Sequence, residues 1–292
     1  ARDPLGIRPL CLGKKEGSWI LSSESSALSH IGADFVREID NGETVVINKE
    51  GIQSSKYNSR SNDHKMCIFE QIYFSRPDSI IDGQLAYESR VKMGESLAKE
   101  HSVDADIVVG VPDSAIPAAI GYSNQSKIPY TEGLIRNRYV GRTFISPNQK
   151  LRELGVKTKF NVLNQVVKDK KIILIDDSIV RGTTTTRVIE MIRDAGAKEV
   201  HMRVSSPPIT SPCYFGVDMA TTSELLANQF SIDDIRKIIG ADSLGFLSLD
   251  ALITSVNSNK NSYCKACFTG DYPMPVQLDF DKFHLEKIKE KN

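Results

Sequence analysis

Neither sign of charge is in excess in this chain, and no long hydrophobic run interrupts it. Among 292 residues, Lys plus Arg number 37 and Asp plus Glu also number 37, so the formal net charge at pH 7 is zero. A balanced charge gives no reason to expect a nucleic acid or an acidic membrane as a partner. No apolar run reaches the roughly 18 residues that a membrane-spanning helix requires. We therefore expect no nucleic-acid partner and no membrane partner.

Cysteine is also sparse, with five residues, and no apolar signal peptide precedes them. Cysteines in a chain without a secretory signal are typical of a reducing compartment, where they serve metals or catalysis more often than disulfides. We therefore expect a cytoplasmic protein. Apolar residues make up 40% of the chain and charged residues 25%, which is typical of a folded protein with one large or two modest domains.

The apolar and polar pattern changes along the chain. Residues 1–55 contain short alternating runs punctuated by glycine, which predicts a β-rich segment, and residues 54–66 are polar and form the predicted linker. Residues 223–256 look mostly helical. Between the linker and that segment, the pattern predicts helices over 87–100 and from 115 to 122, and strands over 106–111, 172–175 and 200–204. Alternation of this kind predicts an α/β fold with a doubly wound, mostly parallel sheet.

The most informative stretch is residues 172–186, which read IILIDDSIVRGTTTT. Four apolar residues predict a buried strand, and Asp176 and Asp177 stand where that strand ends. A short hydroxyl-rich loop with Gly182 follows, and then a helical pattern that ends near Gly196. In open α/β sheets, ligands bind beyond the carboxyl ends of the strands, and a helix N-terminus offers unpaired N–H groups to a phosphate. The two carboxylates can accept hydrogen bonds from vicinal hydroxyls or hold a hard cation. One strand–loop–helix unit could therefore bind both ends of a phosphorylated sugar.

Two further segments have a structural interpretation beside the functional one. Residues 110–114, GVPDS, are either an ordinary turn capped by Asp113 or Ser114, or a second ligand loop at the same edge of the sheet. Residues 133–160 carry seven basic residues against Glu153 alone. They are either a solvated loop or a lid that closes over an anionic ligand and excludes water.

Four of the five cysteines form a second candidate site. Cys264 and Cys267 make a C-x-x-C pair, whereas Cys67 and Cys213 are distant in sequence. By ligand type four thiolates suit zinc or an iron–sulfur cluster equally well, and the residues alone favour zinc. Cys11 lies in an apolar stretch outside this quartet and is predicted to be a small core residue.

Residues 172–186 resemble the 5-phosphoribosyl diphosphate (PRPP) binding motif of the type I phosphoribosyltransferases. Six further segments are similar, in the same order, to those of the amidophosphoribosyltransferase family. They are residues 1–10 (ARDPLGIRPL), 73–79 (YFSRPDS), 110–114 (GVPDS), 137–145 (NRYVGRTFI), 205–208 (SSPP) and 263–270 (YCKACFTG). The resemblance implies a type I phosphoribosyltransferase fold and the first committed step of de novo purine biosynthesis. In that step, PRPP and ammonia, derived from glutamine in the intact enzyme, give 5-phosphoribosylamine and pyrophosphate.

The resemblance also implies roles for single residues. It assigns the ribose hydroxyls and Mg²⁺ to Asp176 and Asp177, with Ser114 near the metal, and it makes Arg138 and Arg142 catalytic residues of a lid. It assigns substrate binding to Ser178, Ile179, Val180, Arg181, Gly182, Thr183, Thr184, Pro112, Asp113 and Tyr73. Residues 73–79 lie, by the same resemblance, between two active sites and help to line an ammonia path.

For the cysteines, the resemblance favours an iron–sulfur cluster, whereas the residues alone favour zinc. It places Cys67, Cys213, Cys264 and Cys267 at the ligand positions of the branch of the family that carries a [4Fe–4S] cluster. Because the reaction moves no electrons, we expect such a cluster to be structural.

A domain plan follows from the resemblance. Residues 1–62 would be the remnant of an Ntn-hydrolase glutaminase domain plus the linker, 63–262 the phosphoribosyltransferase domain, and 263–292 a cysteine-ligand segment and tail. The family's glutaminase nucleophile is an N-terminal cysteine, whereas residue 1 is Ala1, so we expect no glutaminase activity. The family also implies a homotetramer inhibited by purine nucleotides. The alternative is a non-catalytic regulator that binds PRPP or a nucleotide, or an inactive fragment.

Overall fold

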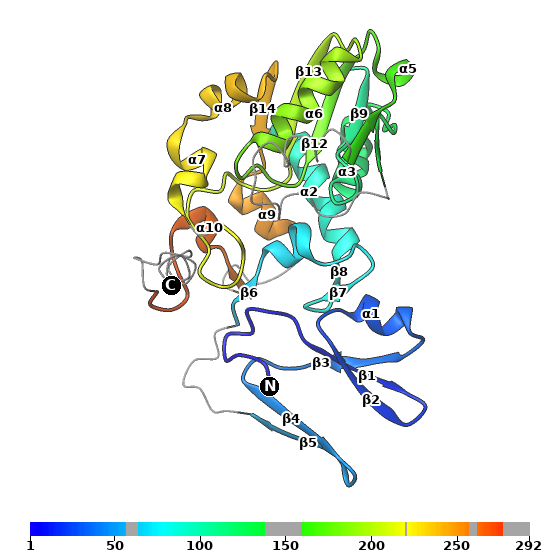
Figure 1. Ribbon diagram of the computed structural model, residues 1–292, viewed down its shortest axis with the longest axis vertical. Coiled ribbons are helices and arrows are strands. Elements are labelled where there is room, and N and C mark those ends of the chain that lie inside the picture. The colour runs from blue at the N-terminus through cyan, green and yellow to red at the C-terminus, as the bar shows by residue number, and fades with distance from the viewer. Residues whose placement is uncertain (57–63, 138–158, 220, 257–261, 277–292) are drawn as a thin grey trace, which may run out of the picture.

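The computed structural model describes residues 1–56, 64–137, 159–219, 221–256 and 262–276 (Figure 1). Its centre is a four-stranded sheet of order β14-β13-β12-β9, in which every neighbouring pair is parallel. The strands are β9 (Ile107–Gly110), β12 (Lys171–Asp176), β13 (Glu199–Val204) and β14 (Ser243–Phe246). The carboxyl ends of all four strands therefore meet at one edge.

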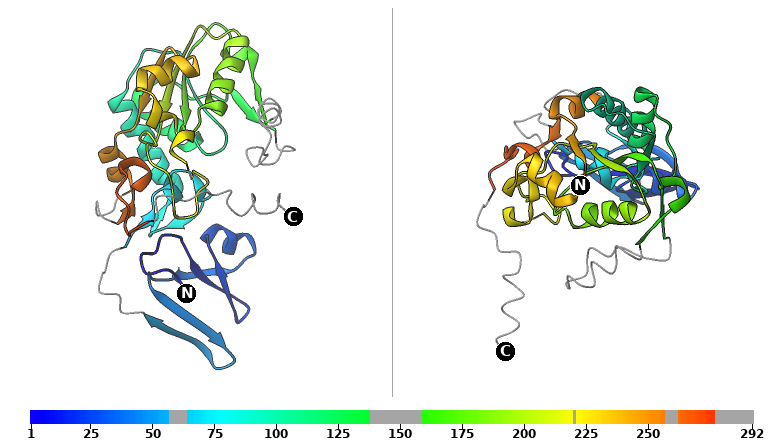
Figure 2. Two further views of the ribbon diagram at one scale, coloured as in Figure 1. Left: turned by 60° about the vertical axis from the view of Figure 1, so that its left-hand side comes forward. Right: turned by 90° about the horizontal axis from the view of Figure 1, so that it is seen from above.

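Helices cover both faces of this sheet. α2 (Ala86–Glu100) and α3 (Ile116–Ser126) lie on one face, and α6 (Thr183–Asp194) lies on the other (Figure 2). α8 (Ile232–Ile239) packs beside α6, and α9 (Leu249–Ser255) packs beside α2. The predicted doubly wound α/β fold with a mostly parallel sheet is confirmed.

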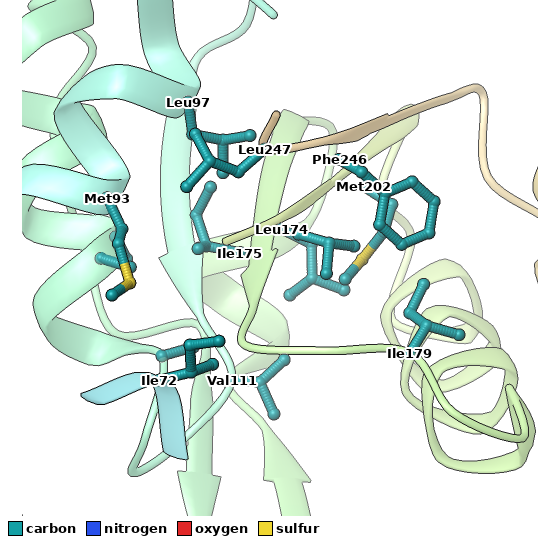
Figure 3. Close-up of a cluster of buried hydrophobic side chains, with 14 of the residues drawn as sticks. Ile72, Met93, Leu97, Val111, Leu174, Ile175, Ile179, Met202, Phe246 and Leu247 are labelled. Atoms are coloured by element: carbon teal, nitrogen blue, oxygen red, sulfur yellow. The ribbon is translucent and has the colours of Figure 1, made fainter. Parts of the chain in front are cut away.

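The core lies between the sheet and these helices. Ile175 of β12 lies with Met93 and Leu97 of α2 on one side of the sheet, and Leu174 of β12 lies with Met202 of β13 on the other (Figure 3). Ile172, Ile173, Leu174 and Ile175 are all 0% exposed, so β12 is buried on both faces. A strand covered on both sides needs apolar residues on both, and this explains the unbroken IILI run.

The β-rich segment lies at the N-terminal end of the chain, coloured blue in Figure 1. It comprises a sheet of order β2-β1-β3, a short helix and the hairpin β4–β5, which confirms the predicted β texture of residues 1–55. The elements are β1 (Cys11–Lys15), β2 (Ser18–Ser22), α1 (Ser25–His30), β3 (Asp34–Glu38), β4 (Glu43–Asn48) and β5 (Gly51–Lys56). Cys11 is 3% exposed here, packed with Leu28 and Ala33, which confirms it as a core residue.

Short elements connect these parts. The paired strands are β6 (Met66–Cys67) with β15 (Tyr263–Cys264), β7 (Ile80–Ile81) with β8 (Gln84–Leu85), and β10 (Leu134–Arg136) with β11 (Phe160–Val162). The short helical elements are η1 (Glu70–Phe74), α5 (Asn164–Val167), η3 (Thr222–Glu224), α7 (Leu226–Gln229) and α10 (Ala266–Thr269). No helix in the described part of the chain has the length and apolarity needed to cross a membrane.

Sequence reasoning missed one strand, in a segment that it correctly predicted to be mostly helical. Residues 223–256 do contain helices, but strand β14 separates α8 from α9 and forms one edge of the central sheet. Its four residues, SLGF, are too few for apolar periodicity to distinguish a strand from a helix. The predicted boundary at 62/63 falls outside the described residues, so the domain plan stays a prediction.

Two glycines set the distance between α2 and α3. A Cβ atom built on Gly94 would overlap the carbonyl oxygen of Ala118, and one built on Gly121 would overlap that of Val91. Each helix thus presents a glycine to the backbone of the other. The close approach leaves no room for even a methyl group.

We therefore expect Gly121→Ala to destabilise the fold. The overlap with backbone outweighs the gain in helix propensity, so the free energy of unfolding should fall by about 2 kcal/mol or more in urea titrations. The control is Asn124→Ala on the exposed side of the same helix, which should change it by no more than about 0.5 kcal/mol. Equal stabilities of the two variants would contradict this account.

Candidate active site

Two carboxylates lie at the carboxyl edge of the central sheet. Asp176 is the last residue of β12 and is 9% exposed, and the adjacent Asp177 is 7% exposed. Ser114, beyond the end of β9, donates its hydroxyl to Asp177 Oδ2 at 2.5 Å, and Ser178 donates to Oδ1 at 2.6 Å. The Asp177 amide donates to Asp176 Oδ1 at 2.9 Å. The parallel register of β9 and β12 thus brings the 110–114 loop and the acidic pair together.

Burial makes this pair electrostatically unfavourable when it is ionised. Loss of hydration, and then the charge of Asp177, raise the pKa of Asp176 well above its ordinary value. Burial also raises the pKa of Asp177, although hydrogen bonds from Ser114 and Ser178 oppose that shift. A positive ligand or a hydroxyl donor would therefore find two acceptors that the protein itself leaves only partly compensated.

Two basic side chains, Lys159 and Arg90, interact electrostatically with the pair, and a third pairs with the neighbouring loop. Arg136 forms an ion pair with Asp113 of the neighbouring loop at 2.5 Å. Lys159 interacts electrostatically with both Asp176 and Asp177, and its pKa is lowered by burial and then by Arg136. Arg90 of α2 is 2% exposed and donates to the carbonyl oxygens of Gln71 and Ser75. Burial lowers the pKa of Arg90, and the charge of Asp177 is the largest influence against that shift.

The loop between β12 and α6 presents backbone donors. Gly182 precedes α6 with φ at +75°, a left-handed conformation that suits glycine. Within the described part of the chain, no acceptor is recorded for the amide N–H groups of residues 179–185. Thr183 and Thr184 are exposed at the start of the helix. Free N–H groups and the positive end of a helix dipole together favour a phosphate group.

The remaining predicted residues fall into three groups. Ile179 is 3% exposed and its side chain enters the core, so it could contact a ligand only through its backbone (Figure 3). Tyr73 of η1 is 39% exposed and interacts electrostatically with Arg90. Arg138 and Arg142 lie outside the described residues, as does most of the predicted lid.

Sequence reasoning missed Arg90. Its spacing held a usable signal, because Ala86, Arg90, Met93 and Leu97 follow the apolar period of a helix and all four are buried. A charged residue at a core position of such a pattern indicates a buried partner. Lys159 carried no comparable signal, since it is one of many basic residues in 133–160.

The four cysteines named above meet in one place. Strand β6 pairs with β15 so that Cys67 stands opposite Cys264. Cys67, Cys213, Cys264 and Cys267 all line one pocket, together with Ile7, Phe69, Phe215, Val217, Met219, Ala266 and Tyr272. None of the cysteines forms a disulfide, and burial raises the pKa of Cys67 to about 12. Among the described residues, no three His, Cys, Asp or Glu side chains are arranged as a ready site for a single metal ion.

Comparisons with known proteins agree with this geometry. A family model described as a phosphoribosyl transferase domain matches residues 85–211, which include both loops. The curated amidophosphoribosyltransferase of Archaeoglobus fulgidus is 50% identical over 277 residues, covering 94% of this chain and 60% of that relative. That of Bacillus subtilis is 47% identical over 291 residues, covering 98% and 61%. A solved structure of glutamine PRPP amidotransferase from B. subtilis, complexed with ADP and GMP, superposes with a TM-score of 0.87 at 47% identity, covering 97% of this chain and 63% of that one.

The parallel sheet, the acidic pair and the family match define a protein with a phosphoribosyltransferase domain. Within that class, the chain belongs to the amidophosphoribosyltransferase family. It spans about three fifths of the length of the curated relatives described above.

The raised pKa of Asp176 predicts how stability depends on pH. A carboxyl group whose pKa is raised above its ordinary 3.8 contributes stability that is fully present below that value and is lost as pH rises through the folded pKa. Asp176→Asn keeps an oxygen to accept the Asp177 amide but cannot ionise. In EDTA, the variant should unfold at the same temperature as the unmodified chain near pH 4 and at a higher temperature at pH 7 to 8.

The control is Asp104→Asn, whose side chain is 96% exposed. It should give no gain that grows with pH. Thermal melts across the pH range measure both variants, and an Asp176→Asn protein that loses stability relative to the unmodified chain as pH rises would contradict the assignment.

Proposed function

We propose that the chain transfers the 5-phosphoribosyl group of PRPP to ammonia, the first committed step of purine biosynthesis. The bond between C1 and the pyrophosphate oxygen breaks, a bond from C1 to nitrogen forms, and the nitrogen loses a proton. The products are 5-phosphoribosylamine and pyrophosphate. The observation that carries the proposal is the buried Asp176–Asp177 pair placed directly before a loop of unpaired amide groups.

Each part of the site suits one part of PRPP. The amides of residues 179–185 and the hydroxyls of Thr183 and Thr184 suit the 5-phosphate. The carboxylates of Asp176 and Asp177 would accept hydrogen bonds from the ribose hydroxyls and stabilise positive charge that develops at C1. The loop at Pro112 and Asp113, with Lys159 close to the acidic pair, lies where a pyrophosphate would leave. Catalysis would then be positioning and charge stabilisation without a side-chain nucleophile.

Mg²⁺ is the proposed cation. Its preferred ligands are oxygens, and Asp176, Asp177 and Ser114 offer two carboxylates and a hydroxyl at one edge of the sheet. When bound, the ion would neutralise charge on the pyrophosphate. Arg138 and Arg142 keep their proposed catalytic role, as residues of a lid over that charge.

A [4Fe–4S] cluster is the proposed occupant of the cysteine pocket. Four thiols from three separate segments face one otherwise apolar pocket, and four thiolates are the usual ligand set of such a cluster. The pocket connects β6, the segment around Cys213 and α10, so a cluster there would join them as a structural crosslink.

Further proposals concern partners. The B. subtilis structure is complexed with ADP and GMP, and we propose that purine nucleotides also bind this chain as inhibitors, because they carry the phosphate that the loop suits. Glutamine as the ammonia source in the intact enzyme, a homotetramer and a cytoplasmic location are proposed on family likeness. The alternative of a non-catalytic regulator has no support, because the curated relatives described above carry the transferase name.

The acidic pair gives the direct test of function. With PRPP, Mg²⁺ and an ammonium salt, pyrophosphate release should rise with pH as neutral ammonia becomes available. Asp177→Asn should lower that rate by about 100-fold or more, because it removes charge stabilisation at C1. Asp104→Asn should leave it unchanged. A normal rate in Asp177→Asn at subsaturating PRPP would refute the role given to that residue.

Iron analysis tests the cysteine pocket. Anaerobically purified protein should be brown and contain about four irons per chain. Cys213→Ser should lose the colour and the iron, whereas Cys11→Ser, which lies outside the pocket, should keep both. Stoichiometric zinc without iron would overturn the cluster.

A further inference from the structure

A short segment with no role assigned so far lies against the loop between β12 and α6, which we call the phosphate loop. It comprises η3 and α7, residues 222–229, and it touches the loop at three consecutive positions. The Leu226 amide donates to the carbonyl oxygen of Val180 at 2.9 Å. Arg181 Nη2 and Glu224 Oε2 form an ion pair at 2.9 Å. The Leu226 side chain packs so close to Gly182 that an added Cβ atom would lie 2.8 Å from its Cδ2.

The ion pair at Arg181 is the polar part of this contact. The Arg181 and Glu224 side chains are 32% and 30% exposed, so the pair is partly withdrawn from water. Arg181 Nε is buried and has no hydrogen-bond partner among the described residues. In the described part of the chain, Glu224 is the carboxylate that pairs with Arg181, and it therefore fixes where this side chain points.

The segment is itself anchored at its far end. Asn228 of α7 donates to the carbonyl oxygen of Thr210 at 2.9 Å, and the Thr210 amide donates to the carbonyl oxygen of Cys267 at 3.0 Å. In the view of Figure 1, α7 accordingly lies between α8 and α10. The segment is thus fixed at one end to α10 and at the other to the phosphate loop.

The loop needs outside support because its own donors are unpaired. Amide groups reserved for a ligand cannot hold the loop by internal hydrogen bonds. If the loop is already ordered before the ligand binds, no free energy of binding is lost in ordering it. We infer that residues 222–229 are a brace that holds the phosphate loop in its ligand-binding shape, with Glu224 as a positioning residue that acts through Arg181. This inference rests on the proposed function.

Variants of Glu224 test the brace by kinetics. Glu224→Ala should raise the KM for PRPP roughly three- to fivefold and leave kcat within about twofold, because the loop still forms once PRPP is bound. The KM of Glu224→Gln should lie between those of the unmodified chain and Glu224→Ala, since the amide oxygen of glutamine can still accept a hydrogen bond from Arg181. The matched control is Glu190→Gln, which breaks the Arg187–Glu190 ion pair at 2.6 Å within α6, the helix that follows the phosphate loop. It should change neither the KM for PRPP nor kcat.

Hydrogen–deuterium exchange tests the same inference without catalysis. In ligand-free protein, peptides covering residues 178–186 should exchange faster in Glu224→Ala and in Asn228→Ala than in the unmodified chain, and should be unchanged in Glu190→Gln. A KM that falls in Glu224→Ala would show that Glu224 competes with the ligand for Arg181, and would overturn the brace. Unchanged exchange in both brace variants would overturn it as well. An unmodified chain without turnover would count against the proposed function alone, because the exchange measurement still decides the inference.

Discussion

The close burial of two carboxylates at the end of the central strand is the constraint on which the rest of the site depends. Asp176 and Asp177 are held there by the geometry of β12, and their charges repel each other in a region from which water is largely excluded. Such an arrangement is unfavourable for folding and useful for binding, because hydroxyl groups and cations find buried carboxylates whose charge the protein compensates only in part. The hydroxyls of Ser114 and Ser178, the charge of Arg90 and the nearby Lys159 limit the penalty without cancelling it.

The phosphate loop also leaves polar groups incompletely hydrogen-bonded, but here they are donors and not acceptors. Its unpaired amides are donors without acceptors, just as the carboxylates are acceptors without sufficient donors. A loop in this condition depends on its neighbours for its shape. Ile179 anchors it to the core, and Leu226 covers Gly182 from outside. The binding groups are therefore held by apolar side chains that do not themselves contact the ligand.

Much of this could be read from the sequence. The IILI run had to be a strand buried on both faces, and a strand followed by Asp-Asp, a small loop and a helix placed the acidic pair at a sheet edge. The position of Ser114 followed from the same rule, because parallel strands end together. Strand β14 escaped prediction because four residues show no decisive period, and Glu224 escaped because its partner lies 43 positions away in sequence. Contacts between distant segments leave no local pattern, and these are the contacts that complete the site.

The cysteine pocket extends this reasoning to the whole molecule. Cys67 lies in β6 just before η1, while Cys264 and Cys267 lie in the last described segment, so the pocket joins parts of the chain almost 200 positions apart. Arg8 of the β-rich segment reaches the same region, pairing with Glu70 and donating to the carbonyl oxygen of Phe215. Glu70 accepts from Ser75, whose carbonyl oxygen in turn accepts from Arg90. A continuous set of hydrogen bonds thus runs from the edge of the cysteine pocket to the buried arginine behind Asp177. The β-rich segment and the edge of the cysteine pocket are therefore linked by hydrogen bonds to Arg90, whose charge acts in turn on Asp177.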